Sequence, residues 1–578
     1  MAQDPGRNVT SGRMRLGARC AAGVALAAAL LCFAALPVAA RSDGMVAAAN
    51  PLAAEAGMAV LRDGGSAADA AVAIQMMLNL VEPQSSGIGG GAFILHWDAS
   101  ARQLLTIDGR ETAPAAATSA RFVGEDGKKL GWWKSMVGGQ SVGVPGTVKS
   151  LGVLHQLFGR KSWATLLAPA IERADAGFEV SPRLASSIES AKHLDRFEKT
   201  RAYFFDADGK PRAAGTRLRN PAFAGTLRQL AEGGPDAFYR GPIAQAVVDA
   251  AAATSWATTN ITLADMAAYR AKVRLPVCQP YRGYDVCGMG PPTSGGLTVG
   301  QILGMLSAFD LGALGWGPEL VHLLAEAEKL AYADRALYMA DADFVQMPTA
   351  GLLDSTYLQE RAALIDPAKA GPVAQAGNPP GAENFAWAPS EAPGLVGTSH
   401  FVVLDAQGNA VSMTTTIESG FGSRVMAAGF LLNNELTDFD RQPERDGRLV
   451  ANRVEGGKRP RSSMSPTIVL RRGEPYLLVG SPGGSRIIGY VAKTLVAILD
   501  LGLSPQEAID LGHAVHRNGK ALELEQGTAT ADMAGALKAF GHEIKTRRLT
   551  SGLHAILLSP DGLEGGADPR REGVVLRP

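Results

Sequence analysis

The sequence predicts a mixed α/β protein, and three observations support this prediction. Helix-start signals dominate the first part of the chain, and alternating segments typical of strands are concentrated after residue 398. The 578 residues are 46% hydrophobic, which is enough to bury a large core. The 56 basic and 56 acidic residues leave no net charge, so nothing indicates binding to nucleic acid or to an anionic membrane surface.

Capping patterns mark the expected helices. Asn50-Pro51 can start a helix that ends at Gly64-Gly65, and Ser66 with Asp69 three residues later can start another that runs through Val81. Two further helices are expected at residues 318–342 and after the cap at residues 504–507.

A hairpin is expected directly after residue 398. Two alternating segments, 399–405 and 409–416, are separated by three residues that end in Gly408, which can adopt the left-handed conformation such loops require. Asp405 would then face Asn409, and Thr398 would lie opposite Thr416. Further strands are expected at residues 429–432, 467–470 and 476–480.

Thr398 is the strongest candidate for a catalytic residue. If the Gly397–Thr398 bond breaks, the threonine gains a free α-amine beside its own hydroxyl, and an N-terminal amine can activate a threonine as a nucleophile. The reference α-amino pKa of about 7.7 to 8.0 leaves a useful neutral fraction near neutral pH. Taken alone, a Gly-Thr step is more often only the start of a strand.

The ordered motifs of the chain resemble those of the γ-glutamyltranspeptidase family of N-terminal-nucleophile hydrolases. The motifs before Thr398 are the segment from Gly44, the glycine run from Ser86, IDGRETAP around Arg110 and SVGVPGT from Ser141. Those from Thr398 onward are GTSHF, FGSR from Phe421, LLNNELTDF from Leu431, KRPRSSMSPTIV from Lys458 and SPGGSRII from Ser481. Each motif alone is weak evidence for the family, but the order of all of them along the chain is specific to it.

This resemblance implies a four-layer αββα sandwich made as one precursor that cuts itself. The expected products are a large subunit, residues 41–397, and a small catalytic subunit, residues 398–578. Functional positions from residue 110 to residue 484 must converge on one site, so the two subunits are expected to share one intertwined domain.

The resemblance also assigns roles at the site. Gly397 and Thr398 form the processing site, and Thr398 is the nucleophile with Thr416 as its hydroxyl partner. Arg110 would hold the substrate α-carboxylate, because its planar fork matches a carboxylate with two hydrogen bonds. The remaining substrate ligands would be Ser462 and Ser463 for the same carboxylate, and Glu435 and Asp438 for the α-ammonium group.

Gly483 and Gly484 lie between an apolar strand and an apolar helical segment. Backbone N–H groups at such a turn can point at a single oxyanion, aided by the positive end of the helix. A tight turn without a ligand is the commoner use of two adjacent glycines.

The chain departs from the family pattern in two places. Glu418 stands where an asparagine is usual; it could strengthen binding of a cation or indicate the related cephalosporin acylases. The segment between Asp438 and Ser462 is shorter than in relatives with a lid and has no tyrosine. We therefore expect an open pocket that favours hydrolysis over transfer.

The first 40 residues have the pattern of an export signal, with four arginines before an uncharged run that ends at Ala40. We expect cleavage there and a periplasmic or secreted protein; a retained anchor is the alternative. The mature chain would keep Cys278 and Cys287 in a hairpin with Pro280 and Gly283 at its turn, either bridged or as free thiols. No metal motif or cofactor is expected.

The expected enzyme is an autoprocessing γ-glutamyl transferase or hydrolase that cleaves γ-glutamyl amides such as glutathione. Its partners would be that small substrate, an amino acid or peptide acceptor or water, and the two subunits of one precursor. One alternative is a glutaryl or cephalosporin acylase of the same fold. Another is a periplasmic amino-acid-binding protein that is never processed.

Overall fold

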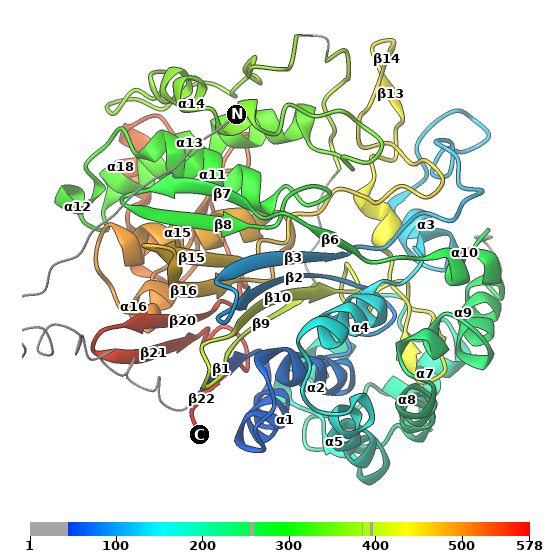
Figure 1. Cartoon of the computed structure of the whole chain (residues 1–578). Coiled ribbons are helices and arrows are strands. Elements are labelled where there is room, and N and C mark those ends of the chain that lie inside the picture. Colours follow the sequence, from blue (N-terminus) through cyan, green and yellow to red (C-terminus); the bar gives the residue numbers. More distant parts are fainter. Residues whose placement is uncertain (1–43, 255–258, 384, 393–396) are drawn as a thin grey trace, which may run out of the picture. The chain divides into compact units, whose positions relative to one another are not determined.

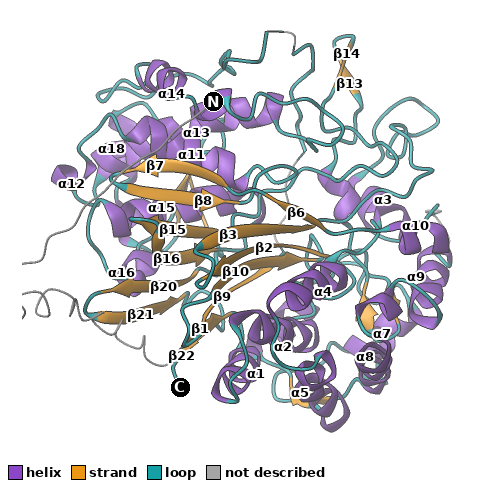
Figure 2. Ribbon diagram, viewed as in Figure 1, coloured by secondary structure: helices purple, strands orange, loops and turns teal. Residues whose placement is uncertain are grey.

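Two stacked β-sheets form the centre of the computed structural model, which describes residues 44–254, 259–383, 385–392 and 397–578. The larger sheet has the strand order β22-β1-β9-β10-β2-β3-β6, and the second sheet has the order β21-β20-β16-β15-β8-β7. Strands β9 and β10 of the first sheet pack against β16 and β20 of the second. Helices cover both outer faces (Figures 1 and 2), so the four-layer αββα sandwich is confirmed.

The larger sheet is antiparallel throughout. Its strands are β1 (Met45–Ala48), β2 (Gly91–Asp98), β3 (Gln103–Gly109), β6 (Lys272–Arg274), β9 (Ser399–Leu404), β10 (Ala410–Thr416) and β22 (Val574–Leu576). The second sheet consists of β7 (Val277–Tyr281), β8 (Tyr284–Gly288), β15 (Thr467–Arg471), β16 (Glu474–Gly480), β20 (His554–Ser559) and β21 (Gly562–Ala567). Both sheets combine strands from before and after Thr398, so cleavage at Thr398 would leave two intertwined subunits.

The outer helices follow the capping signals closely. Helix α1 (Pro51–Arg62) begins after the Asn50 cap, and α2 (Ala67–Val81) has a capping box formed by Ser66 and Asp69. With α4 (Thr147–Phe158), α5 (Trp163–Ala176) and α8 (Pro221–Gly233), they belong to the apolar core on the larger sheet. On the second sheet lie α11 (Gly295–Leu306), α13 (Pro318–Tyr338), α15 (Ile487–Leu499) and α16 (Pro505–Asp510).

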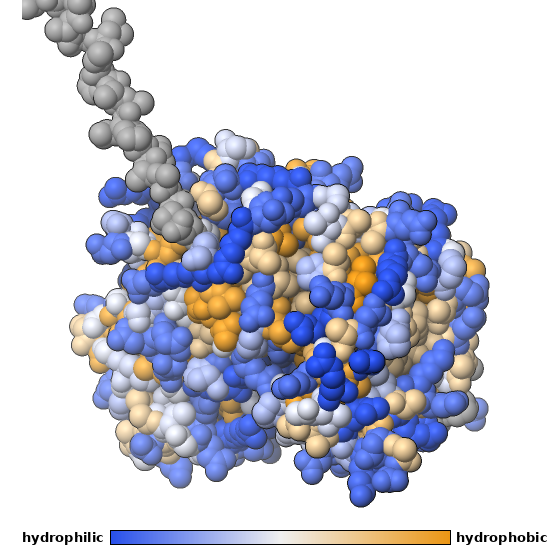
Figure 3. All heavy atoms as spheres, turned by 90° about the horizontal axis from the view of Figure 1, so that it is seen from below, coloured by the Kyte–Doolittle hydropathy of each residue, from blue (hydrophilic) through white to orange (hydrophobic). Residues whose placement is uncertain are grey.

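Smaller elements join these layers. They are α3 (Trp132–Met136), α6 (Pro182–Ser190), α7 (Glu198–Phe204), α9 (Pro242–Ala252), α10 (Leu263–Ala268), α12 (Leu311–Leu314), α14 (Ser355–Ala362), α17 (Ala529–Asp532), α18 (Ala534–Ala539), and the short strands β4 (Phe178–Glu179), β5 (Arg217–Leu218), β11 (Met426–Ala427), β12 (Phe430–Leu431), β13 (Glu444–Arg445), β14 (Arg448–Leu449), β17 (Ala514–Val515), β18 (Leu522–Glu525) and β19 (Ile544–Arg547). In Figure 3 the visible face has polar residues between small apolar areas.

The predicted hairpin has the expected register. Strands β9 and β10 pair Leu404 with Ala410 and Ser399 with Thr415, and Gly408 has a φ of 86°. This register places Thr398 opposite Thr416.

Three boundaries differ from the sequence expectation. Helix α13 ends at Tyr338 rather than at residue 342, because the following turn is held by Asp341, which accepts a hydrogen bond from the distant Arg459 N–H. The strand expected at 429–432 is only β12. Pro280 lies within β7 and not in the turn, which an edge strand allows because its missing N–H faces no neighbouring strand.

Cys278 and Cys287 are directly paired across β7 and β8, and a disulfide links them. The expected export signal falls on residues 1–40, which lie outside the described residues. Among the described residues, no helix has the length and apolar character needed to cross a membrane.

Candidate active site

The site lies where strands of both sheets begin or end at one edge of the sandwich. Arg110 follows β3, Thr398 precedes β9, Thr416 ends β10, and the Gly483-Gly484 turn follows β16. Antiparallel pairing brings the end of each strand beside the start of its neighbour, so these positions meet although they are far apart in the sequence.

Thr398 is held in a backbone conformation that is rare for a β-branched residue, with a φ of 90°. Its N–H donates to the Ser85 carbonyl at 2.8 Å, and its own carbonyl accepts from Arg571 Nη1 at 2.8 Å. Such a conformation persists only when its surroundings fix it, and it is found mainly at functional sites. Here the strain lies directly at the Gly397–Thr398 bond.

Thr416 is in hydrogen-bond contact with the candidate nucleophile. The Oγ1 atoms of Thr398 and Thr416 are 3.1 Å apart. Thr416 Oγ1 also accepts the N–H of Glu418 at 2.8 Å, which orients its hydroxyl so that its proton can point toward Thr398.

Two glycines allow the backbone to approach this pair closely. A Cβ at Gly397 would lie 1.9 Å from the Glu418 carbonyl oxygen, and a Cβ at Gly90 would lie 1.9 Å from the Thr416 carbonyl oxygen. Because these neighbours are backbone atoms, a side chain at either position would displace the strand ends that carry the site.

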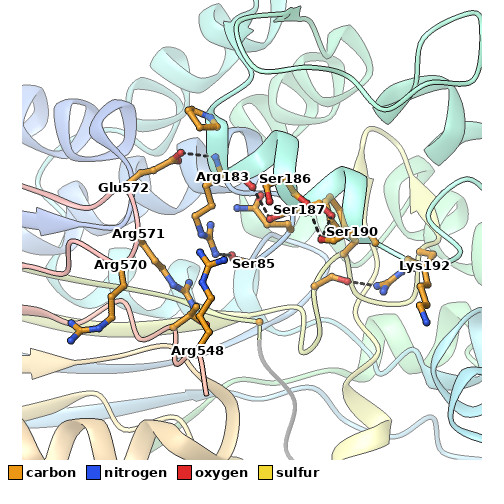
Figure 4. Close-up of a pocket in the computed structure, with 18 of the residues that line it drawn as sticks. Ser85, Arg183, Ser186, Ser187, Ser190, Lys192, Arg548, Arg570, Arg571 and Glu572 are labelled. Carbon is orange, nitrogen blue, oxygen red and sulfur yellow. Dashed lines mark hydrogen bonds between the residues drawn. The ribbon is translucent and has the colours of Figure 1, made fainter. Parts of the chain in front are cut away.

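A small pocket, with a volume of about 20 Å³, brings most of the predicted residues together. Its lining includes Arg110, Thr398, Thr416, Glu418, Glu435, Asp438, Ser462, Ser463 and Gly484. Gly483 is not in this lining, and Gly397 lines a larger neighbouring cavity (Figure 4). No residue between Asp438 and Ser462 contributes to the described lining of the pocket.

Arg110 makes more ion pairs and hydrogen bonds within the protein than the sequence suggested. Its side chain is buried and ion-paired with Glu435 and with Asp438, the latter at 2.6 Å. Its guanidinium also donates to the carbonyls of Pro460 and Arg461 at 3.1 Å. The resemblance implies that Arg110 and the two carboxylates bind opposite ends of the substrate head group, whereas in the structure they contact each other.

The pocket holds more carboxyl groups than cations. Burial raises the pKa of Glu435 to about 7, with the Arg110 charge opposing this shift and Asp438 adding to it. Burial, together with Asp438 and Glu435, holds the pKa of Glu418 well above its usual range. Burial and Glu435 likewise raise the pKa of Glu111, which sequence reasoning did not single out. A positive group entering the pocket would favour the ionised form of these carboxyls.

A second buried arginine supports the serine pair. Arg335, in α13, donates from Nη2 to Ser463 Oγ at 2.6 Å and from Nε to Ser294 Oγ at 2.8 Å. It forms no ion pair within the described part of the chain, so its charge acts on the serine end of the pocket. Sequence reasoning missed it because its helix carries no local signal for a site.

The Gly483-Gly484 turn has the backbone that two glycines favour. Their φ values are 138° and 62°, and a Cβ at Gly483 would lie 2.6 Å from the Tyr490 ring. Neither N–H donates a hydrogen bond to another described residue. With Gly484 in the pocket lining, this turn can offer free donors to an anion at the start of α15.

A cluster outside the pocket has residue types that can bind metals. His322, Glu326 and His542 place ligand atoms within 4.8 Å of one another. His322 Nδ1 and His542 Nε2 lie 2.8 Å apart and hydrogen-bond to each other, while Glu326 pairs with Lys329 at 2.9 Å. These mutual contacts account for the cluster without a metal ion.

Comparisons with known proteins agree with this geometry. A family model described as gamma-glutamyltranspeptidase matches residues 53–577. The chain belongs to this family. The resemblance inferred from the motifs is therefore confirmed, and the protein is an enzyme of the γ-glutamyltranspeptidase type.

Relatives of two kinds are similar to the chain along most of its length. The glutathione hydrolase proenzyme of Bacillus subtilis (strain 168) is 37% identical, and the match covers 92% of this chain and 91% of that protein. The Acylase ACY 1 proenzyme of Pseudomonas sp. (strain SE83) is also 37% identical, with 92% and 93% covered. The crystal structure of cephalosporin acylase from Bacillus halodurans has a TM-score of 0.80 at 28% identity, covering 93% of this chain and 96% of that one.

Proposed function

We propose that this protein cleaves γ-glutamyl amides such as glutathione and passes the γ-glutamyl group to water or to an amino acid or peptide acceptor. The observation that carries this proposal is the contact between the hydroxyls of Thr398 and Thr416 at a pocket that also holds Arg110 and several carboxyl groups. A nucleophile beside an amino-acid-sized set of charges is what acyl transfer from glutamate requires.

The first reaction would be cleavage of the precursor. The Thr398 hydroxyl attacks the Gly397 carbonyl carbon, the peptide C–N bond breaks and an ester forms between Gly397 and Thr398 Oγ. Water then hydrolyses the ester, which releases the Gly397 carboxylate and the free amine of Thr398. The strained φ of Thr398 supports this site, because cleavage relieves the constraint.

The second reaction would use the same hydroxyl on the substrate. Thr398 Oγ attacks the γ-carbonyl carbon, the α-amine of Thr398 accepts the hydroxyl proton, and the N–H groups of Gly483 and Gly484 stabilise the oxyanion. The proton passes to the leaving amine as the amide C–N bond breaks. Water or an acceptor amine then attacks the ester and frees Thr398.

The substrate head group would be that of an α-amino acid. Its carboxylate would be bound by Arg110, Ser462 and Ser463, with the charge of Arg335 behind the serines. Its ammonium group would be bound by Glu435, Asp438 and Glu418. The substrate carboxylate would then replace part of the ion pairing that Arg110 makes in the empty pocket.

A glutaryl or cephalosporin acylase is the second candidate, favoured by Glu418 and by the acylase relatives. A glutaryl group has a carboxylate but no amine, so the carboxyl groups of the pocket would have no cationic partner in the substrate. Rates with γ-glutamyl and glutaryl anilides separate the two: we expect faster cleavage of the γ-glutamyl compound.

A denaturing gel with N-terminal sequencing tests the proposal. Processing predicts fragments 41–397 and 398–578, with the smaller one starting at Thr398, whereas the Thr398→Ala chain stays whole. An unprocessed wild-type chain would support a binding protein instead. The N-terminus of the larger fragment tests export, which rests on the leader pattern: a start at Arg41 is expected.

A further inference from the structure

Helix α13 contacts the site at two separate places. Its Arg335 donates to Ser463 Oγ at the end of the pocket that we assign to the substrate carboxylate. The hydroxyl of Tyr332, three residues earlier, donates to the carbonyl oxygen of Ser485, which directly follows the Gly483-Gly484 turn. Side chains three positions apart lie on the same face of a helix, and the Arg335 guanidinium is 5.7 Å from the centre of the Tyr332 ring. One face of α13 therefore contacts both the carboxylate end of the pocket and the residue that ends the turn.

Ser485 is buried, and two residues outside the turn hold it. Its carbonyl accepts the bond from Tyr332, which is 5% exposed and belongs to the apolar core on the second sheet. Its side chain is held separately, because Ser485 Oγ accepts a hydrogen bond from Arg517 Nη1 at 2.8 Å. Losing either partner would leave a buried polar atom of Ser485 without that bond, which is costly.

The Gly483-Gly484 turn needs such support because its glycines do not fix its shape. Glycine adopts more backbone conformations than other residues, so the directions of the two N–H groups depend on what holds the ends of the turn. Within the turn, the Arg486 N–H donates to the Gly483 carbonyl at 3.4 Å, which is longer than most protein hydrogen bonds. Holding Ser485 in place restricts the conformations of both glycines and therefore the directions of their donors.

We propose that Tyr332 is a positioning residue for the Gly483-Gly484 turn, and that α13 sets the placement of this turn relative to the serines that bind the substrate carboxylate. This inference rests on the proposed function and adds a positioning residue to it. Tyr332 is not in the described lining of the pocket, so it acts through Ser485 and does not contact the substrate. Its hydroxyl therefore stabilises the oxyanion of the transition state without contributing to the binding of the substrate head group.

The test separates the transition state from the bound ground state. Tyr332→Phe keeps the aromatic ring and removes the hydroxyl that holds Ser485. In the processed protein we expect kcat for γ-glutamyl anilide to fall about tenfold, the size of one lost hydrogen bond. The inhibition constant of L-glutamate, which has the head group but forms no oxyanion, should stay within about twofold of the wild-type value.

Tyr338→Phe is the matched control. Tyr338 lies on the same helix, is 2% exposed and donates from its hydroxyl to the Gly377 carbonyl at 2.7 Å, outside the described lining of the pocket. This variant also removes one bond from a buried tyrosine to a carbonyl, so it measures the general cost of such a loss in α13. We expect its kcat and its inhibition constant for L-glutamate to be near the wild-type values.

Two further variants complete the comparison. Arg517→Gln removes the other bond to Ser485 and should lower kcat with the inhibition constant unchanged, which tests the anchoring of Ser485 even if Tyr332→Phe does not fold. Arg335→Gln should show the opposite pattern. Its inhibition constant for L-glutamate should rise about tenfold, because the charge behind Ser463 is lost.

The inference is overturned if Tyr332→Phe keeps the wild-type kcat or, should that variant not fold, if Arg517→Gln keeps it. An equal loss of kcat in Tyr338→Phe would also overturn it, as would a rise of the inhibition constant in Tyr332→Phe that matches the fall of kcat, since this shows a loosening of the whole pocket. A distinct result, that the processed wild-type protein cleaves neither γ-glutamyl anilide nor glutathione, would mean that the proposed function itself fails.

Discussion

At the scale of single residues, the proposed chemistry depends on the hydroxyl pair of Thr398 and Thr416. Thr416→Val keeps the shape of the side chain but removes the hydrogen bond to Thr398 Oγ1. We expect processing to slow, and kcat for a γ-glutamyl anilide to fall by about a hundredfold or more, as when one catalytic hydrogen-bond donor is lost. Gel densitometry and steady-state rates measure both effects.

Thr415→Val is the matched control. Thr415 is the adjacent residue of β10, and its buried hydroxyl has no partner among the described residues. Replacing it should leave processing and kcat near the wild-type values. Equal losses in both variants would mean that the strand, rather than the Thr416 hydroxyl, limits activity.

We propose that Glu418 helps the site to distinguish γ-glutamyl from glutaryl substrates. Glu418→Gln removes a carboxyl group that we assign to the α-ammonium of a γ-glutamyl substrate. The ratio of kcat/KM for γ-glutamyl anilide to that for glutaryl anilide should fall about tenfold, because a charge-assisted contact is lost for the first substrate and no such contact exists for the second. An unchanged or higher ratio would show that Glu418 does not contact the ammonium group.

At the scale of elements, the glycine run before β2 lets that strand pack against the end of β10. Gly90→Ala would place a Cβ 1.9 Å from the Thr416 carbonyl oxygen. We expect a loss of stability of about 1–3 kcal/mol or more, together with slower processing, because backbone atoms must move. Denaturant unfolding in the unprocessed Thr398→Ala background and a gel of the processed form measure these effects.

Gly131→Ala controls for the general cost of replacing a glycine. Gly131 has a φ of −55°, and no atom lies within 4 Å of the added Cβ. The free energy of unfolding and the extent of processing of the Gly131→Ala variant should stay close to the wild-type values. If Gly90→Ala behaves in the same way, close packing of β2 on β10 is not needed for the site.

The helices and strands also show which features can be predicted from the sequence alone. Helix starts and the hairpin register were predictable, because Asn50, Ser66 and Gly408 act on residues a few positions away. The pairing of Arg110 with Glu435 was not, since it joins residues 325 positions apart and depends on the folded sheets. Arg335 and Arg571 were missed for the same reason: each reaches the site through one long-range hydrogen bond.

At the scale of the whole molecule, buried histidines should make the fold sensitive to acid. Burial lowers the pKa of His96 and His554 to about 4, and it also lowers the pKa of His400 and His513 well below the usual value. In the unfolded chain these groups take up protons near pH 6.5. Their contribution to stability is therefore complete above pH 6.5 and is lost as the pH falls toward 4.

His554→Gln should reduce this acid sensitivity. Between pH 7 and pH 5 the Thr398→Ala chain should lose on the order of 2 kcal/mol more free energy of unfolding than the same chain with His554→Gln. The raised pKa of Glu435 acts in the opposite direction in both chains and cancels in this comparison. Denaturant unfolding at the two pH values measures the difference, and equal losses would contradict the prediction.

The most direct test of the central claim is mass spectrometry of the processed protein, quenched with acid during turnover of a γ-glutamyl substrate. We predict a small subunit that starts at Thr398 and carries one γ-glutamyl group, mapped to that N-terminal threonine. An active protein with an intact Gly397–Thr398 bond, or a γ-glutamyl group bound to a different residue, would contradict the account.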